Sequence, residues 1–367
     1  MKKLFFIAAI AGAALVSCTK NELAPSITEQ EQITFATPVS NVVTKATLVN
    51  TTYPTTSGFS VFADYHKDEY NTAKANPTTN FTPYMRGEEG VAVTHKTETI
   101  TIGSNTYNSY WSPANSYYWP KDGYLTFAAY SPTAANAHAE ITYSVTNGIQ
   151  MNDFTIQAPA AQYDLMLSNR ATDQTSEKMV INTPDPYDGV QIVFTHALSA
   201  IDFTVKTAKN YTTDNYTIDL KSITITNAYS KGDLTQFANI DQGTAGNNWT
   251  DYKEEASYLV PNSAIASLTN SAQEITPDTN TADLILLPQA LTHSPNKVSV
   301  VVVYTVSHPD MGTGKSIEYT TTLPLDNGTI STWDAGKRYT YNITIGMEEV
   351  IFAPTVTVWV PVPGIDL

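Results

Sequence analysis

Hydrophobic and polar residues alternate along much of this chain with a period of two. β-branched and aromatic residues recur in short runs, and Gly, Pro, Asn and Asp separate one run from the next. The runs are ITFA at 33–36, FSVFADY at 59–65, YLTFAAY at 124–130, ITYSV at 141–145, VQIVF at 190–194, AIDFTV at 200–205, SITIT at 222–226, ADLILL at 282–287, KVSVVVVYTV at 297–306, YTYNITI at 339–345 and TVTVWV at 355–360. No segment keeps an apolar period of 3.6 residues over the length of a substantial helix. The pattern predicts an all-β protein, and β-sandwiches are the usual way to bury this many short strands.

The length of 367 residues exceeds one typical domain and suggests two. The best boundary is NTPDPYDG at 182–189, which combines two prolines, two aspartates and a glycine directly before a strand-like run. We therefore expect one domain over residues 32–186 and a second over residues 187–367.

The first 17 residues have the layout of a secretory signal. Lys2 and Lys3 give a short positive stretch, and residues 4–16 are almost wholly apolar, with small residues towards the end. The apolar run is shorter than the roughly 20 residues that a membrane-spanning helix needs. We expect residues 1–17 to be removed on export.

Cys18 is the only cysteine in the chain, so an internal disulfide is excluded. Leu15-Val16-Ser17-Cys18 resembles a bacterial lipobox, in which the thiol at the new N-terminus receives a lipid with fatty acyl chains such as palmitate. We expect Cys18 to carry this anchor and the polar residues 18–31 to form a tether between lipid and fold. The alternative is a chance cysteine at the end of an ordinary signal peptide.

The charge of the chain is strongly acidic. Its formal net charge is −15 with a pI near 4.7, and removal of residues 1–17 takes away two lysines and gives −17. Because phosphate binding needs clustered Lys and Arg, this balance argues against nucleic acid and anionic lipid head groups as partners. Only 15% of residues are charged and 22 are Tyr, a composition that favours half-buried strands over helices.

No group of residues in the sequence has the spacing of a catalytic or metal site. The six histidines are scattered and there is no further cysteine, so we predict neither a metal nor another cofactor. His196 in VFTHALSAIDF is the most suggestive, and we interpret it as a hydrogen-bonded structural residue. The five tryptophans could stack on sugars, although in a sandwich they more often lie in the core.

Longer blocks carry a family resemblance. They are YYWPKDGYLTFAAYSP at 117–132, GVQIVFTHALSAIDFTV at 189–205, LILLPQAL at 284–291, WDAGKRYTYNITI at 333–345 and IFAPTVTVW at 351–359. Together and in this order they resemble the fimbrillin family of Bacteroidales, the type V pilus subunits that include fimbrillin-A and Mfa-like proteins. The resemblance runs from the lipobox to the last strand. It implies two transthyretin-like β-sandwich domains in series, export as a lipoprotein to the outer membrane, and assembly on the cell surface by strand exchange.

The resemblance also implies a maturation site. In the family the N-terminal strand fills a groove of the precursor until a trypsin-like surface protease removes it. Lys45-Ala46 matches such a site, because it follows the strand at 33–36 in a Thr-rich segment. Family members often carry Arg there, so an Arg-only protease would leave this subunit intact and attached to its lipid. The alternative is that Lys45 is an ordinary surface lysine.

The C-terminal residues 355–367 are the candidate donor strand. Val356, Val358 and Val360 share one face, as a donor must present alternate apolar side chains to successive pockets. Pro361 cannot donate to a ladder, so regular pairing should end near Val360. A permanent core strand would show the same period.

We therefore interpret the chain as a non-enzymatic structural subunit of a surface fimbrium with a role in adhesion. Its expected partners are other fimbrial subunits, the outer-membrane lipid at Cys18 and the protease. The sequence does not separate stalk, tip and anchor roles. The leading alternative is a monomeric outer-membrane surface lipoprotein that binds glycans through exposed aromatic residues. A secreted β-sandwich enzyme is the third and least favoured interpretation.

Overall fold

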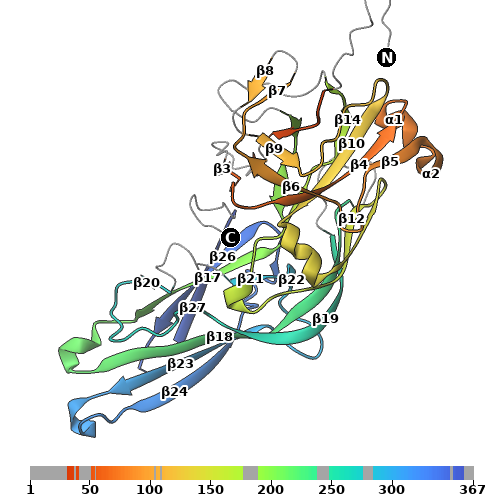
Figure 1. Ribbon diagram of the computed structural model, residues 1–367. Coiled ribbons are helices and arrows are strands. Elements are labelled where there is room, and N and C mark those ends of the chain that lie inside the picture. Colours follow the sequence, from red (N-terminus) through yellow and green to blue (C-terminus); the bar gives the residue numbers. More distant parts are fainter. Residues whose placement is uncertain are drawn as a thin grey trace, which may run out of the picture. The chain divides into compact units, whose positions relative to one another are not determined.

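A computed structural model describes residues 31–36, 39–40, 51–53, 55–102, 105–107, 110–176, 189–237, 248–275, 284–347 and 350–358. Their regular secondary structure is almost all β, which confirms the predicted all-β fold class (Figure 1). No helix among them exceeds six residues. The helices are α1 (Tyr70–Ala73), α2 (Pro77–Asn80), η1 (Thr133–His138), η2 (Pro159–Ala161), η4 (Tyr211–Asp214) and η5 (Pro309–Met311). Three two-stranded ladders pair β2 (Val39–Ser40) with β3 (Thr51–Thr52), β7 (Ile100–Ile102) with β8 (Asn105–Tyr107), and β22 (Gln289–Ala290) with β25 (Thr332–Trp333).

A ten-stranded sheet contains most of the N-terminal strands. In sheet order they are β15 (Val190–Gln191), β1 (Phe35–Ala36), β9 (Tyr110–Pro113), β6 (Val91–Lys96), β4 (Phe59–His66), β10 (Tyr124–Ser131), β13 (Met166–Ser168) and β16 (Phe194–His196), with β14 (Ala171–Gln174) beside β10 and β5 (Phe81–Met85) beside β4. The end strands β15 and β16 are separated by only two residues of chain. The sheet therefore curls until its two ends lie close together.

The core of the ten-stranded sheet is rich in aromatic residues. Phe35, Phe59, Trp111, Phe127 and Phe194 are each at most 1% exposed. The ring of Phe35 meets Phe59 and Phe127 edge to face, with 5.7 Å between centroids in both pairs. Such pairs add to the free energy gained by burying the rings.

A six-stranded sheet is built around one long strand. In order it contains β11 (Glu140–Ser144), β12 (Gly148–Thr155), β18 (Thr217–Thr235), β23 (Ser299–Ser307) and β24 (Ile317–Pro324), with β19 (Asn248–Leu259) also beside β18. The first half of β18 pairs with β23, and its second half pairs with β12 and β19 (Figure 1). The register shifts next to Asn227, whose φ is +59°. This irregularity lets one strand serve two sets of neighbours.

A five-stranded sheet completes the fold. In order it contains β20 (Gln273–Glu274), β17 (Ser199–Thr207), β26 (Lys337–Ile345) and β27 (Val350–Val358), with β21 (Leu284–Leu286) also beside β17. Strands β17 and β26 are parallel, and β26 and β27 are antiparallel.

The five- and six-stranded sheets share one core. Alternate residues of β17 and β26, such as Phe203 and Tyr341, are buried, and their rings stack with centroids 5.7 Å apart. Alternate residues of β18 and β23, such as Ile223 and Val302, belong to the same cluster. This is the packing that alternation with a period of two predicts for a sandwich.

Strand pairing crosses the predicted domain boundary in both directions. Strand β12 pairs with β18 of the six-stranded sheet, whereas β15 pairs with β1 of the ten-stranded sheet. The proposed boundary itself falls in residues 177–188, outside the described part of the chain. The division into domains at 32–186 and 187–367 stays a prediction.

Candidate functional site

The N-terminal segment of residues 31–36 is inserted into the ten-stranded sheet. It lies between two neighbours, because Phe35 pairs with Trp111 of β9 on one flank and with Val190 of β15 on the other. The backbone N–H of Ile33 donates to Tyr117 O at 2.8 Å, and the N–H of Val190 donates to Thr34 O at 2.9 Å. The segment is therefore a strand with ladder hydrogen bonds on both sides.

The side chains of this segment are buried on both faces. Ile33 and Phe35 are 0% exposed, Thr34 is 2% exposed, and Ala36 is 8% exposed. Full burial of a large apolar side chain contributes about 1.5–3 kcal/mol. Removal of the segment would uncover the aromatic core and leave the facing strands with unpaired N–H and C=O groups.

Gly189 permits the close approach of this segment. A Cβ atom on Gly189 would lie 2.4 Å from Thr34 O and 2.6 Å from Phe35 N, both of them backbone atoms. A side chain here would therefore push the two backbones apart. The sequence contained a signal of this contact, a glycine directly before the VQIVF run, but pattern alone did not reveal which strand lies against it.

The chain just downstream of the predicted cleavage site is anchored in the same core. Tyr53 is 5% exposed, and its ring stacks on Phe194 at 5.6 Å. Its hydroxyl lies 2.5 Å from Ser131 Oγ and donates to Gly58 O at 3.0 Å. Burial raises the pKa of Tyr53 well above its usual value, so the phenol stays neutral. These contacts of Tyr53 are with Phe194, Ser131 and Gly58, all of which lie outside the N-terminal segment.

The residues predicted for lipidation and cleavage lie outside the described part of the chain. These are Cys18 in the first 30 residues, and Lys45 and Ala46 in the connection between β2 and β3. Their roles stay predictions.

The candidate donor strand contains the described residues 355–358, which form the last part of β27. Strand β27 ends the order of the five-stranded sheet and pairs with β26 over nine successive residues. Its first half contributes to the core: Val350 and Phe352 pack against it, and the Phe352 ring stacks on Tyr341 at 4.9 Å. Pro354 lies in the middle of the strand and has no N–H to donate, as is typical of an edge.

The second half of β27 is bound more weakly. Val356 lies opposite Tyr339 and is 46% exposed, and Val358 lies opposite Lys337 and is only partly buried. Tyr339 itself is buried, and burial raises its pKa to about 12. Val360 lies outside the described residues. The structure thus places Val356 and Val358 on one face of an edge strand. Within the chain this strand pairs with β26 in the five-stranded sheet, whereas the N-terminal segment belongs to the ten-stranded sheet.

Two buried histidines form hydrogen bonds within the protein. His196 is 5% exposed, and its Nδ1 lies 2.7 Å from Asp164 Oδ2, which confirms a buried, hydrogen-bonded histidine. His66 contacts Thr126 Oγ1 through Nε2 at 2.8 Å. Within the part of the chain that the structure describes, no group of three or more His, Cys, Asp or Glu side chains could hold a metal ion.

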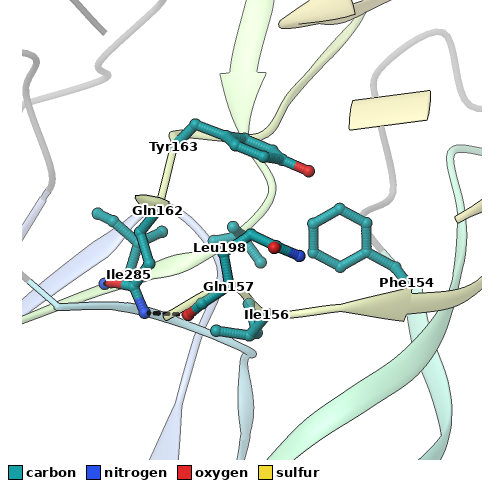
Figure 2. Close-up of a pocket in the computed structure, with 7 residues that line it drawn as sticks. All are labelled: Phe154, Ile156, Gln157, Gln162, Tyr163, Leu198 and Ile285. Carbon is teal, nitrogen blue, oxygen red and sulfur yellow. Dashed lines mark hydrogen bonds between the residues drawn. The ribbon is translucent and has the colours of Figure 1, made fainter. Parts of the chain in front are cut away.

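The cavity in Figure 2 has room for about one water molecule. It is lined by Phe154, Ile156, Gln157, Gln162, Tyr163, Leu198 and Ile285, and its volume is about 10 Å³. Two of the lining residues are linked by a hydrogen bond, which Gln162 Nε2 donates to Gln157 O at 3.1 Å (Figure 2). A small organic substrate would need a space of several hundred Å³.

The four tryptophans that the structure describes do not form an exposed row. Trp111, Trp119, Trp249 and Trp333 are at most 8% exposed, and Trp359 lies outside the described residues. This arrangement does not favour a glycan-binding surface built from tryptophan. Among the described residues, no helix has the length and apolar character needed to cross a membrane.

Comparison with known proteins places this arrangement in a family. A family model described as fimbrillin-like matches residues 44–359, most of the chain. The chain belongs to the fimbrillin-like family. Membership supports a role as a fimbrial subunit at the cell surface that assembles with other subunits, and it favours a structural protein over an enzyme. No curated protein matches the chain.

Two solved structures illustrate the range of similarity. A fimbrial protein from Bacteroides vulgatus ATCC 8482 is 19% identical with a TM-score of 0.54, and the match covers 90% of this chain and 100% of that one. The tip fimbrial protein Mfa3 from Porphyromonas gingivalis, with a C-terminal truncation, is 9% identical with a TM-score of 0.37, over 89% of this chain and 100% of that one. The first match supports the fold of this fimbrillin-like chain.

Proposed function

We propose that this fimbrillin-like chain is a structural subunit of a type V fimbrium that assembles by protease-triggered strand exchange. It is exported as a lipoprotein and held at the outer membrane through acylated Cys18. Cleavage after Lys45 then frees it from the lipid and prepares it for assembly.

One observation carries the proposal: a buried strand lies upstream of the candidate cleavage site. Residues 31–36 fill the space between β9 and β15. In the sequence, the peptide bond after Lys45 comes after this segment and before the anchored Tyr53. Once that bond is cut, only non-covalent contacts hold the segment. Its departure opens a groove with two unpaired strand edges, to which an extended segment of another subunit can add.

The proposed donor has the same alternation as the segment that it replaces. In Ile33-Thr34-Phe35, two apolar residues flank a threonine, and Val356-Thr357-Val358 repeats that order. Successive residues of a strand point to opposite faces, so the two valines would occupy the positions of Ile33 and Phe35. The valines are smaller than the residues that they replace, and the groove must close around them.

The position of the donor in its own subunit is compatible with release. Its described residues lie at a sheet edge, and Val356 is nearly half exposed. Detachment from β26 therefore uncovers less apolar surface than detachment of a central strand such as β17 would.

Isolated fimbriae test the proposal. Surface appendages probed for this chain by electron microscopy should be labelled along polymers, and mass spectrometry of the polymer should find an N-terminus at Ala46. Cells that carry Lys45→Ala should accumulate full-length, lipidated subunit and lack these polymers. Polymers that retain residues 33–45 would contradict the maturation step, and labelled cells without polymers would contradict the fimbrial role.

A further inference from the structure

Strand β24 is an edge strand without the usual protection. It pairs with β23 in an unbroken register from Ser299 opposite Pro324 to Val306 opposite Ile317. No strand that the structure describes pairs with its other flank. Native proteins protect such edges with lysines, prolines, bulges or short strands. Eight residues long, β24 has no lysine and no bulge, and its single proline is the last residue.

The core-facing side of β24 carries a row of mainly apolar side chains, part of which the core does not cover. Its alternate residues Ile317, Tyr319, Thr321 and Leu323 lie opposite buried residues of β23, so they share the core-facing side. Leu323 packs against the core, whereas Ile317 is 49% and Tyr319 is 38% exposed. The Tyr319 ring stacks on Tyr304 with centroids 5.3 Å apart. This row is therefore ordered but incompletely covered.

The sandwich is bridged on the side opposite to β24. The segment that follows β19 bonds to β18 through Leu220 N–H, which donates to Ile265 O at 2.8 Å. The same segment bonds to β17 through Ile275 N–H, which donates to Phe203 O at 3.0 Å. Away from this bridged side, the six-stranded sheet continues from β18 through β23 to β24, and the five-stranded sheet continues from β17 through β26 to β27. Both edge strands thus lie on the unbridged side.

We propose that β24 pairs antiparallel with β24 of a second copy of this chain, about a two-fold axis at Thr320. In this register Ile317 of one copy lies opposite Leu323 of the other, and Tyr319 lies opposite Thr321. These four positions belong to the core-facing side, so the apolar rows of the two copies become continuous. A self-complementary interface of this kind is what two-fold symmetry requires.

The charges of β24 fit the same register. Glu318, the only charged residue of the strand, lies opposite Thr322 of the second copy and does not meet its own equivalent. Exposed Lys315 precedes β24 and Asp326 follows it, so antiparallel pairing brings Lys315 of one copy to the same end of the strand pair as Asp326 of the other, once at each end. Hydrogen bonds from Thr292 and from the Gly328 N–H lower the pKa of Asp326, which keeps this carboxylate charged at neutral pH. This match favours a second copy over an unrelated strand in a chain whose net charge otherwise opposes self-association.

Cysteine crosslinking tests the register directly, because Cys18 is the only native thiol. The full, uncut chain with Cys18→Ser is used, so that strand exchange does not contribute. Directly opposed residues of an antiparallel pair have Cα atoms about 4.5–5.5 Å apart, within the span of a disulfide. Thr320→Cys should therefore form a covalent dimer under mild oxidation. Thr322→Cys is the matched control, because its two copies are offset by four residues, roughly 13 Å along the strands.

Sedimentation measures the same contact without a crosslink. Thr320→Lys places a charge at the axis and should convert the dimer to monomer, whereas Thr250→Lys on exposed β19 should leave the dimer unchanged. Four results would overturn the proposal: a parent chain that is monomeric at all concentrations, equal crosslinking of the two cysteine variants, crosslinking through Thr322→Cys alone, or a dimer that tolerates Thr320→Lys.

Discussion

Phe35→Ala should destabilise the uncut subunit but not the assembled fimbrium. Phe35 is fully buried, meets Phe59 and Phe127 edge to face, and belongs to a strand with neighbours on both flanks. Truncation of such a side chain costs about 3–5 kcal/mol. A loss of that size is a large part of the roughly 5–15 kcal/mol that stabilises an ordinary domain. If cleavage after Lys45 removes the segment, the polymer contains no residue 35 and loses nothing.

Two denaturation measurements separate these states. Urea unfolding of the purified uncut chain gives its free energy of unfolding, and dissociation of the polymer with temperature gives the stability of the assembled form. Phe194→Ala is the matched control, because Phe194 lies in the same core at 1% exposed but stays in the subunit after cleavage. It should weaken both states. Phe35→Leu removes less side-chain volume and supplies a milder variant if Phe35→Ala folds poorly in cells.

The reasoning is refuted if Phe35→Ala polymers dissociate as easily as Phe194→Ala polymers. That result would mean that the N-terminal segment remains in the assembled subunit. An uncut Phe35→Ala chain with unchanged stability would show instead that the segment contributes little to the precursor.

Two further substitutions and one deletion test the remaining steps. Cys18→Ser should abolish incorporation of labelled fatty acid and membrane fractionation, and retained label would contradict the lipoprotein assignment. Deletion of residues 355–367 should yield a subunit that is still folded by circular dichroism and limited proteolysis but cannot join a fimbrium, because Val356 is nearly half exposed. An unfolded product would identify these residues as permanent core. Gly189→Ala should lower the free energy of unfolding of the uncut chain, measured in urea, by about 1–3 kcal/mol, because the new Cβ meets the backbone of Thr34. Gly232→Ala is the control, since the atom nearest to its new Cβ would be 3.4 Å away. Equal effects of the two substitutions would argue against the close approach at Gly189.

The strands with strong alternation could be predicted from the sequence. The YTYNITI run at 339–345 lies within β26, and the KVSVVVVYTV run at 297–306 overlaps β23 almost completely. In both, one face packs into the core and the other does not, and this asymmetry produces the period of two. The same asymmetry explains why His196 could be interpreted correctly as a structural residue.

Edge strands and sheet partners were harder to predict. Strand β24 has three successive threonines and only three apolar residues at alternate positions, and β19 carries several charges, so neither run is strongly apolar in the sequence. The alternation predicts the VQIVF run at 190–194 as one strand, but the structure divides it between β15 and β16 at opposite ends of the ten-stranded sheet. Pairing between distant segments depends on tertiary contacts such as the one at Gly189, which no local pattern encodes.

Limited trypsin treatment of the purified chain tests the central claim most directly. The claim is that removal of the N-terminal strand opens the groove for the donor of another subunit. After brief cleavage, the wild-type chain should lose residues up to Lys45, begin at Ala46 and form polymers visible by electron microscopy. The Lys45→Ala chain under the same conditions should keep residues 31–36 and stay unpolymerised. Cut chains that begin at Ala46 and never polymerise, or Lys45→Ala chains that polymerise equally well, would contradict the account.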